Sequence, residues 1–341
     1  MRAVICRQWM PYQDLELEDV PSPTVGPRQV RIGTHYAGVS FATSLVTQGR
    51  YQRKPPFPFS PGTEVAGEIL EVAPDVTHLK SGQRVCAVVD WGGHAEEVVI
   101  DAATVYPIPD SLPFDLAPQF PTSYATSFAA LDWLAKLQPG ETLLVHGSAG
   151  AVGLAAVELG KAMGARVVAT ASTQAKLDIV RAHGADATVA FPSADALEEI
   201  RTLVKNGPGG GAHVVFDPVG GDAFDLSLRA VGECGRILVI GFANGRIQQI
   251  PANILLVKNI SVLGFNYGKY TGWTLTDERK QHEARVRAQF DRMFAWYEQG
   301  KLQPVTSHHF ALAEFPAAMD AVLNRQAIGK IVLRMPRAEA A

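Results

Sequence analysis

The sequence predicts an α/β protein with two domains, one a β-rich barrel or sandwich and the other a doubly wound parallel sheet. Three observations support this fold class. The chain has 341 residues, and roughly 150 residues per domain suggests two domains. Its N-terminal third holds short Val- and Ile-rich segments punctuated by Gly and Pro. From Pro121 onward, apolar segments alternate with longer amphipathic ones, which is typical of βαβ units.

Four short segments are the expected strands of the first domain. Regular short strands separated by turn residues favour a barrel or sandwich. The Pro-rich segment Pro55–Pro61 is expected to be a loop, because proline interrupts both helices and strand ladders. The expected strands are Val30–Ser40, Glu64–Ala73, Arg84–Asp90 and His94–Asp101.

The second domain is expected to alternate strands and helices. Its strands are nearly continuous apolar runs, as a sheet covered on both faces requires. Several of its helices end at a glycine, a common stop signal. The expected strands are Thr142–Ser148, Arg166–Ser172, Ala187–Phe191, Ala212–Gly220, Gly235–Gly241 and Ile260–Gly268. The expected helices are Ala151–Gly164, Thr173–Gly184, Ala194–Gly207 and the segment starting at Asp222. A charged helix, Glu278–Gln299, and a strand–helix–strand segment follow.

Composition and charge exclude several classes of protein. The net charge of −3 gives no support for a nucleic-acid partner. Hydrophobic residues make up 47% and charged residues 19%, which is typical of a folded chain. The three cysteines, Cys6, Cys86 and Cys234, are far apart, which excludes a disulfide framework and a four-cysteine zinc lobe. The sequence has no signal-peptide pattern and no uncharged apolar stretch of about 18 residues, so we expect a soluble cytoplasmic protein.

The sharpest motif is HGSAGAVG, from His146 to Gly153, between an expected strand and an expected helix. Gly150 can take up a tight turn and lets the main chain approach a pyrophosphate, while Gly153 allows the helix to pack closely on the strand. The free N–H groups at the helix start then face the anion. An ordinary glycine-containing turn is the alternative, but the βαβ context favours dinucleotide binding.

The end of the following strand favours NADPH over NADH. An NAD site usually carries Asp or Glu there to hold the ribose hydroxyls. Here the strand ends in Ser172 and Thr173, and Lys176 follows one turn into the helix. Two hydroxyls and a cation suit a 2′-phosphate, although a lone Lys is more often a solvated helix residue.

The segment Gly140–Lys161 resembles the signature of the zinc-independent quinone oxidoreductases of the medium-chain dehydrogenase/reductase superfamily. Ala151 replaces a second Gly of that signature and Glu158 replaces Gln. The resemblance continues in the same order along nearly the whole chain, through PGTEVAGEI (61–69), FDPVGGDAF (216–224), GRILVIGFA (235–243) and AIGKIVL (327–333).

This resemblance implies a GroES-like catalytic domain, residues 1–119 and 269–341, with a Rossmann NADPH-binding domain, residues 120–268, inserted into it. It also implies homodimers or homotetramers, often joined by edge pairing of the Rossmann sheets, for which Ile260–Gly268 is the candidate strand. The implied cofactor-binding residues are Thr126, Gly150, Ala151, Val152, Gly153, Ser172, Thr173, Lys176, Phe191, Gly241, Phe242, Ala243, Arg325 and Lys330.

Zinc-dependent relatives in this superfamily use a Cys and a Gly-His-Glu motif. Here the matching positions hold Ser40 and the triplet Gly62-Thr63-Glu64. His308 and His309 are adjacent, and neighbouring residues in a strand point to opposite faces, so they make a poor chelate. We therefore expect no metal.

Without a Lewis acid, the fold favours hydride delivery to an acceptor that is already electrophilic. Tyr51 is the first candidate for a hydrogen-bond donor to the acceptor, and an aromatic side chain packed on Pro55 and Pro56 is the alternative interpretation. Ser40, Thr43 and Trp91 are candidate pocket residues.

Three hypotheses remain. The first is an NADPH-dependent quinone reductase, and the second is an NADPH-dependent reductase of activated C=C bonds in enones or enoyl thioesters. Arg50, Arg53 and Lys54 could serve an acyl-CoA, although such charge runs are usually solvated. The third is a dinucleotide-binding protein without catalytic activity.

Overall fold

The computed structural model describes residues 1–339 and divides into two compact units. Unit 1 holds Met1–Thr122, Tyr267–Glu298 and the chain from Pro304 onward, and unit 2 holds Ser123–Asn266 and Gln299–Gln303. The predicted boundaries place residues 299–303 in the GroES-like domain, whereas the structure assigns them to unit 2. The backbone N–H of Gln303 donates to Glu158 Oε2 at 2.9 Å, which ties this short segment to unit 2.

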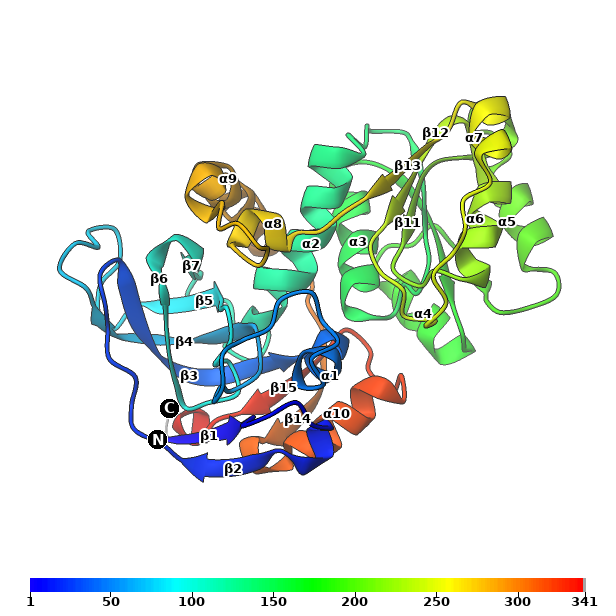
Figure 1. The fold of residues 1–341 in the computed structure, drawn as a ribbon. Coiled ribbons are helices and arrows are strands. Elements are labelled where there is room, and N and C mark those ends of the chain that lie inside the picture. The colour runs from blue at the N-terminus through cyan, green and yellow to red at the C-terminus, as the bar shows by residue number, and fades with distance from the viewer. Residues whose placement is uncertain (340–341) are drawn as a thin grey trace. The chain divides into compact units, whose positions relative to one another are not determined.

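Unit 2 contains a parallel sheet with the strand order β10-β9-β8-β11-β12-β13 (Figure 1). This order reverses between β8 and β11, as in a doubly wound fold, and ligands of such folds bind at the carboxyl ends of the strands near that point. The strands are β8 (Thr142–Val145), β9 (Arg166–Ala171), β10 (Ala187–Ala190), β11 (Ala212–Asp217), β12 (Val231–Val239) and β13 (Ser261–Gly264).

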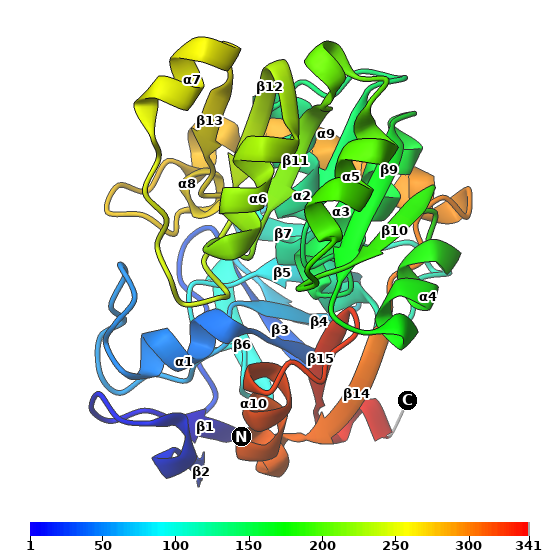
Figure 2. The same cartoon turned by 90° about the vertical axis from the view of Figure 1, so that its right-hand side faces the viewer.

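Helices cover both faces of this sheet, with α2 and α3 on one side and α5 and α6 on the other (Figures 1 and 2). Burial on both faces explains the continuous apolar runs in the strands, since every residue of β8 is buried. The helices are α2 (Ala125–Ala129), α3 (Ala151–Ala162), α4 (Gln174–Ala182), α5 (Ala196–Val204), α6 (Asp222–Ala230) and α7 (Ala252–Lys258).

Unit 1 is built around a sheet with the order β14-β15-β3-β4-β5-β7, in which β6 also pairs with β3. Strands β1 and β2 form a separate antiparallel pair. The C-terminal strand β15 pairs antiparallel with β3, so the two ends of the chain share one sheet. The strands are β1 (Arg2–Ile5), β2 (Glu16–Asp19), β3 (Gln29–Val39), β4 (Glu64–Val72), β5 (Arg84–Val88), β6 (Glu97–Asp101), β7 (Val105–Pro107), β14 (Thr306–Ala311) and β15 (Lys330–Arg334).

The core of unit 1 comes from alternate residues of these strands, such as Ile32, Ile69 and Leu333. Its helices are α1 (Phe41–Thr47), α8 (Gly268–Thr271), α9 (Arg279–Glu298) and α10 (Phe315–Leu323). A β-rich unit together with a doubly wound unit confirms the predicted fold class.

The observed elements differ from the predicted ones mainly at their ends. The predicted strand Thr142–Ser148 stops at Val145, because residues 146–150 form the turn into α3. The sequence pattern does not predict the helical turns between Ala117 and Leu134, since Pro118 and Pro121 interrupt a regular helix signal. Within residues 1–339, no helix is both long and apolar enough to cross a membrane.

Candidate functional site

The turn between β8 and α3 opens the helix without a capping side chain. Gly150 is the N-cap residue, in an extended conformation with φ −78° and ψ 168°, and it has no side chain with which to cap the helix. Its carbonyl accepts the first helical hydrogen bond, from Leu154 N, at 2.8 Å. The N–H groups of the first turn therefore have no acceptor within the helix, and such groups at the positive end of a helix dipole are suited to an anion.

The two glycines of this turn have different surroundings. A Cβ added at Gly153 would lie 2.3 Å from Gly147 O and 2.8 Å from Ser148 Cα, so only glycine allows this helix to approach the strand end. A Cβ at Gly150 would make only an ordinary contact, 3.5 Å from Gly147 O. Gly153 therefore serves the packing of the turn, whereas Gly150 leaves space for a ligand.

The ends of β9 and β10 lie next to this turn. Ser172 is exposed, and Thr173 caps α4 by accepting a hydrogen bond from Lys176 N at 3.3 Å. Phe191 N donates to Ala171 O at 2.9 Å, and the Phe191 ring lies 6.0 Å from the ring of His146. The predicted residues after these two strands are thus brought to the same sheet edge as the glycine turn.

The loops after β11 and β12 complete this edge. Ala243 N donates to Pro218 O at 3.2 Å, and the exposed Phe242 lies beside it in sequence. Thr126 lies on α2, where its neighbour Ser127 donates to Val152 O at the start of α3 at 2.8 Å. The structure thus gathers the predicted cofactor-binding residues of unit 2 at the carboxyl edge of one sheet.

Two buried polar residues, His146 and Asp217, support this edge, and the sequence pattern does not predict either as a site residue. His146 is fully buried, and its Nδ1 lies 2.9 Å from Thr170 Oγ1. Burial lowers the pKa of His146, which favours the neutral imidazole. The carboxylate of Asp217 accepts from the N–H groups of Val219 and Gly220 at 2.8 and 2.9 Å, which fixes the loop after β11. A polar residue at the end of an otherwise apolar strand is the signal that could have identified both.

In unit 1, the predicted acceptor-site residues occupy two places. Ser40 and Thr43 lie at the start of α1, with their hydroxyl oxygens 3.4 Å apart. Tyr51 and Trp91 are half-buried against the core of the unit. Tyr51 packs edge-on against Trp273, with ring centroids 5.2 Å apart, and burial raises the pKa of its phenol.

The basic segment beside Tyr51 is only partly a solvated surface. Arg50 and Lys54 are exposed, whereas Arg53 forms an ion pair with Asp90 at 3.1 Å. Arg325, also in unit 1, is exposed and has a positive φ of 57°. Lys330 is 4% exposed and forms a buried ion pair with Glu64, which is 1% exposed.

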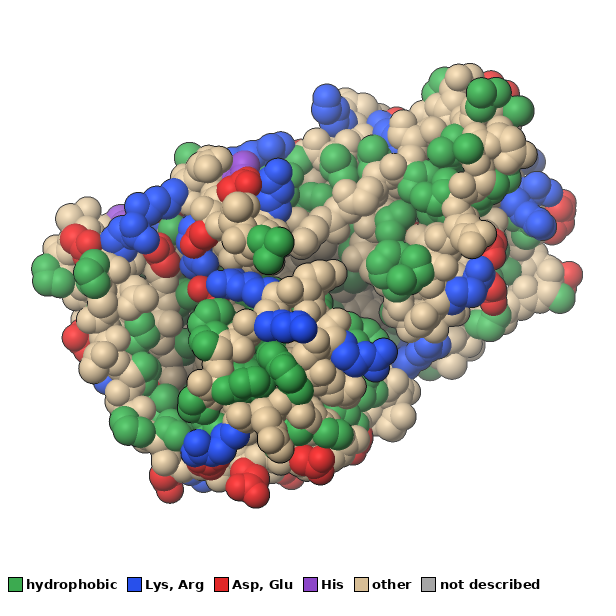
Figure 3. Space-filling view, in the orientation of Figure 1, with side chains coloured by type: hydrophobic (Ala, Val, Ile, Leu, Met, Phe, Trp, Pro, Cys, Tyr) green, Lys and Arg blue, Asp and Glu red, His purple; other side chains and the backbone are tan. Residues whose placement is uncertain are grey.

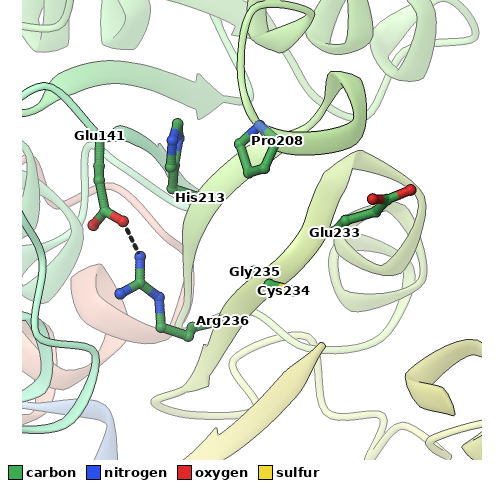
Figure 4. Close-up of a pocket in the computed structure, with 7 residues that line it drawn as sticks. All are labelled: Glu141, Pro208, His213, Glu233, Cys234, Gly235 and Arg236. Atoms are coloured by element: carbon green, nitrogen blue, oxygen red, sulfur yellow. Dashed lines mark hydrogen bonds and ion pairs between the residues drawn. The ribbon is translucent and has the colours of Figure 1, made fainter. Parts of the chain in front are cut away.

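Unit 2 also has a shallow cavity of about 300 Å³ at the opposite, amino-terminal end of its strands (Figure 4). Glu141 and Arg236 form an ion pair there, and His213 Nδ1 accepts from Thr142 N at 3.0 Å. These contacts hold the starts of β8, β11 and β12 together. The cavity is therefore separate from the sheet edge that carries the glycine turn.

Comparisons with known proteins agree with this arrangement. Residues 26–110 match the family model described as alcohol dehydrogenase GroES-like domain, and residues 151–280 match the one described as zinc-binding dehydrogenase. The quinone oxidoreductase-like protein 2 homolog of Nematostella vectensis is 39% identical, covering 97% of this chain and 88% of its own length. Quinone oxidoreductase-like protein 2 of Rattus norvegicus is 36% identical, covering 98% and 92%.

Among solved structures, the quinone oxidoreductase of Thermus thermophilus, crystallised by itself and in complex with NADPH, superposes with a TM-score of 0.82. It is 33% identical and covers 98% of this chain and 100% of its own. The chain belongs to the quinone oxidoreductase family of the medium-chain dehydrogenase/reductase superfamily. This confirms the resemblance noted in the sequence, including the GroES-like and Rossmann-like domains.

In this quinone oxidoreductase-family chain, the positions that match zinc ligands carry hydroxyls. Ser40 precedes α1 and Thr63 precedes β4. In the part of the chain that the structure describes, no group of three or more His, Cys, Asp and Glu side chains is arranged to hold a metal ion.

Proposed function

We propose that this protein is an NADPH-dependent oxidoreductase that delivers hydride to a quinone without a bound metal. The observation that carries the proposal is the uncapped helix start after β8, beside a β9 end that has hydroxyls in place of a carboxylate. The relationship to the Thermus thermophilus quinone oxidoreductase, which was crystallised with NADPH, supports it.

The residues at the sheet edge fit the chemistry of NADPH. The N–H groups of Ala151, Val152 and Gly153 would hold the pyrophosphate, and the space at Gly150 would let it approach the backbone. Ser172, Thr173 and Lys176 would hold the 2′-phosphate, since a carboxylate at this place would repel it. Phe191 would flank the adenosine, and Gly241, Phe242, Ala243 and Thr126 would line the nicotinamide side. Arg325 and Lys330, which belong to unit 1, remain proposed cofactor-binding residues.

NADPH, when bound, supplies the hydride. The chain's own residues would bind and orient the acceptor, exclude water and place a hydrogen-bond donor at the acceptor oxygen. Tyr51, Ser40, Thr43 and Trp91 remain the proposed acceptor-site residues. The neutral Tyr51 phenol, whose pKa is raised by burial, suits a donor role.

The residues at the positions that match zinc ligands support a reaction that needs no metal. Ser40 and Thr63 offer hydroxyls where zinc would require a thiolate and an imidazole. Metal analysis of the purified protein is expected to find less than about 0.1 zinc per chain. Stoichiometric zinc, with activity lost on chelation, would contradict this part of the proposal.

The test of the proposed function is NADPH oxidation against a panel of quinones, enones and enoyl-CoA esters. We expect quinones to give the highest kcat/KM. A higher kcat/KM for enones or enoyl-CoA esters would assign the protein to C=C reduction instead. Binding of NADPH without turnover of any acceptor would indicate a non-catalytic protein.

The cofactor preference has a separate test. Ser172→Asp would place a carboxylate beside the 2′-phosphate, so the ratio of kcat/KM for NADPH over NADH should fall at least about tenfold. Thr202→Asp, an exposed position on α5, is the matched control and should leave the ratio unchanged. A wild-type protein that uses both cofactors equally would contradict the NADPH assignment.

We also propose that two copies pair along β13. This strand is at the edge of the unit 2 sheet, and an edge leaves unpaired backbone groups available to another strand. Leu256 and Val257 on the neighbouring α7 are 78% and 76% exposed. Figure 3 shows hydrophobic side chains at the surface over α7, as expected for an apolar interface with a second copy.

A further inference from the structure

Asp217 ends β11, the strand that lies between β8 and β12 in the sheet of unit 2. The residue is 1% exposed, and its Oδ1 accepts from the N–H groups of both Val219 and Gly220, at 2.8 and 2.9 Å. A buried carboxylate is costly unless it is hydrogen-bonded, so the carboxylate and the loop after β11 hold each other in place. The backbone of residues 218–220 therefore turns around one buried anion.

One side of this loop packs on the glycine turn that precedes α3. Gly147 has a φ of 57°, and a Cβ added there would lie 2.9 Å from Val219 Cγ2 and 3.6 Å from Pro218 Cγ. His146 N donates to Phe216 O at 3.0 Å, which holds the end of β8 beside β11. The Val219 side chain therefore limits where the backbone of the glycine turn can lie.

The other side of the loop packs on the segment after β12. Asn244 N donates to Val219 O at 2.9 Å. A Cβ added at Gly220, which has a φ of 71°, would lie 3.4 Å from the Phe242 ring. The loop after β11 thus contacts both the glycine turn and the segment that is proposed to line the nicotinamide side.

We propose that Asp217 is a positioning residue for NADPH, which fixes the glycine turn and the segment after β12 at one spacing through the loop between them. This inference rests on the NADPH-binding part of the proposed function and adds a buried residue to it. NADPH would contact the turn through its pyrophosphate and the segment after β12 through its nicotinamide end. A ligand that contacts two segments binds more tightly when both are already in place, because less order has to be imposed on binding.

Two ligands separate this role from general damage to unit 2. NADPH would contact both segments that the loop joins, whereas adenosine 2′-monophosphate has neither the pyrophosphate nor the nicotinamide. A variant that loosens the whole unit should weaken both ligands, whereas a loss of positioning should weaken NADPH alone. The monophosphate would need only the ends of β9 and β10, with Ser172, Thr173, Lys176 and Phe191.

Two substitutions of Asp217 test the role of its oxygen. Asp217→Ala removes the acceptor of both N–H groups, so the Kd of NADPH should rise at least about tenfold, while the Kd of adenosine 2′-monophosphate stays within about twofold. Asp217→Asn keeps an oxygen at that place and should restore the Kd of NADPH to within about threefold of wild type. Isothermal titration calorimetry measures NADPH binding, and NMR titration measures the weaker monophosphate.

Asp186→Ala is the matched control. Asp186 also accepts from a backbone N–H, that of Val167 at 2.7 Å, but at the amino-terminal end of β9. Its removal takes away a carboxylate that holds the backbone at the opposite edge of the same sheet. Both Kd values should therefore stay within about twofold of wild type.

Val219→Ala carries the test if Asp217→Ala does not fold. It keeps the carboxylate but removes the methyl groups that pack on Gly147, so the Kd of NADPH should rise about threefold to fivefold. The double variant Asp217→Ala, Val219→Ala should exceed Asp217→Ala alone by at most about twofold, because both changes act through one loop.

Two results would overturn the inference. One is a Kd of NADPH that stays within about twofold of wild type in Asp217→Ala and in Val219→Ala, and the other is an equal rise for both ligands. Failure of the proposed function looks different: NADPH would bind with the expected dependence on Asp217, yet the wild-type protein would oxidise none of it with any acceptor. Asp217 would then stand as a positioning residue of a dinucleotide-binding protein.

Discussion

Gly150 and Gly153 are three residues apart in one turn, yet substitution by alanine should affect different properties. At Gly153 it should lower stability, and at Gly150 it should lower NADPH affinity. Gly153→Ala brings a Cβ against backbone atoms at 2.3 and 2.8 Å, so the free energy of unfolding should fall by about 1–3 kcal/mol. Gly150→Ala has room and a φ of −78° that alanine tolerates, so its cost should be about 1 kcal/mol or less.

The NADPH affinity completes this comparison. Gly150→Ala should weaken NADPH binding by at least about tenfold, because the new methyl group occupies space left for the pyrophosphate. Urea denaturation and NADPH titration of both variants measure the two effects. A stable Gly153→Ala protein, or a Gly150→Ala protein with unchanged NADPH affinity, would contradict these roles.

His94 should make the stability of unit 1 depend on pH. It is fully buried, with Nε2 3.2 Å from Gly38 O, the Phe315 ring 5.1 Å away and the Lys330–Glu64 ion pair nearby. Burial, with a smaller contribution from Lys330, lowers its pKa from 6.5 to about 4. The unfolded chain then binds the proton more tightly, so stability is complete above pH 6.5 and is lost as the pH falls toward 4.

Replacing His94 by Phe should remove this part of the pH dependence. Between pH 7.5 and 5.5 the wild-type free energy of unfolding should fall by about 1.4 kcal/mol more than that of His94→Phe. Urea unfolding at the two pH values measures the difference, and His146 contributes equally to both proteins. Equal pH dependence would mean that His94 accepts a proton without cost in the folded state.

At the scale of elements, Glu158 connects α3 to three other segments of unit 2. The carboxylate is 3% exposed and accepts from Tyr124 OH at 2.6 Å and from Gln303 N at 2.9 Å. Its other oxygen lies 2.5 Å from Nδ1 of His183, at the end of α4. The Glu158 carboxylate on α3 thus holds the residue before α2, the end of α4 and the short segment 299–303 together.

Removing the Glu158 carboxylate should lower the free energy of unfolding more than neutralising its charge does. Glu158→Ala removes the carboxylate that accepts from both the Tyr124 hydroxyl and the Gln303 N–H, so the free energy of unfolding should fall by about 3 kcal/mol. Glu158→Gln keeps an oxygen in place and should cost about 1 kcal/mol or less. Chemical denaturation of the two variants provides the measurement, and equal losses would show that the charge itself matters.

For the whole molecule, the proposed pairing along β13 predicts a homodimer in solution. The double variant Leu256→Glu, Val257→Glu places like charges on the apolar surface of α7 and should shift the protein to monomers at micromolar concentration. Light scattering coupled to size-exclusion chromatography measures the mass. Leu275→Glu is the matched control, since Leu275 is 98% exposed in unit 1 and should not alter assembly. A variant that remains dimeric would place the interface elsewhere.

Much of the architecture could be predicted from the sequence because its signals are local. Apolar runs, helix stops at glycine and the spacing of Gly150 and Gly153 all lie within one βαβ unit, where neighbouring residues determine the structure. The two-unit organisation, the family and the residues at the carboxyl edge of the unit 2 sheet follow from such patterns. Element ends were less predictable, as the early end of β8 at Val145 illustrates.

The tertiary structure alone decided which distant side chains meet. Asp90 meets Trp273 across 183 positions, Arg53 meets Gly272 across 219, and Lys330 meets Glu64 across 266. No local period encodes such pairs. Lys330 and Glu64 meet because β15 and β4 both pair with β3, and the other two pairs form because residues 267–298 return to unit 1. The sequence by itself thus determined the fold class and the glycine turn, whereas the contacts of Asp90 with Arg53, Arg279 and Trp273 exist only because chain folding brings these distant segments together.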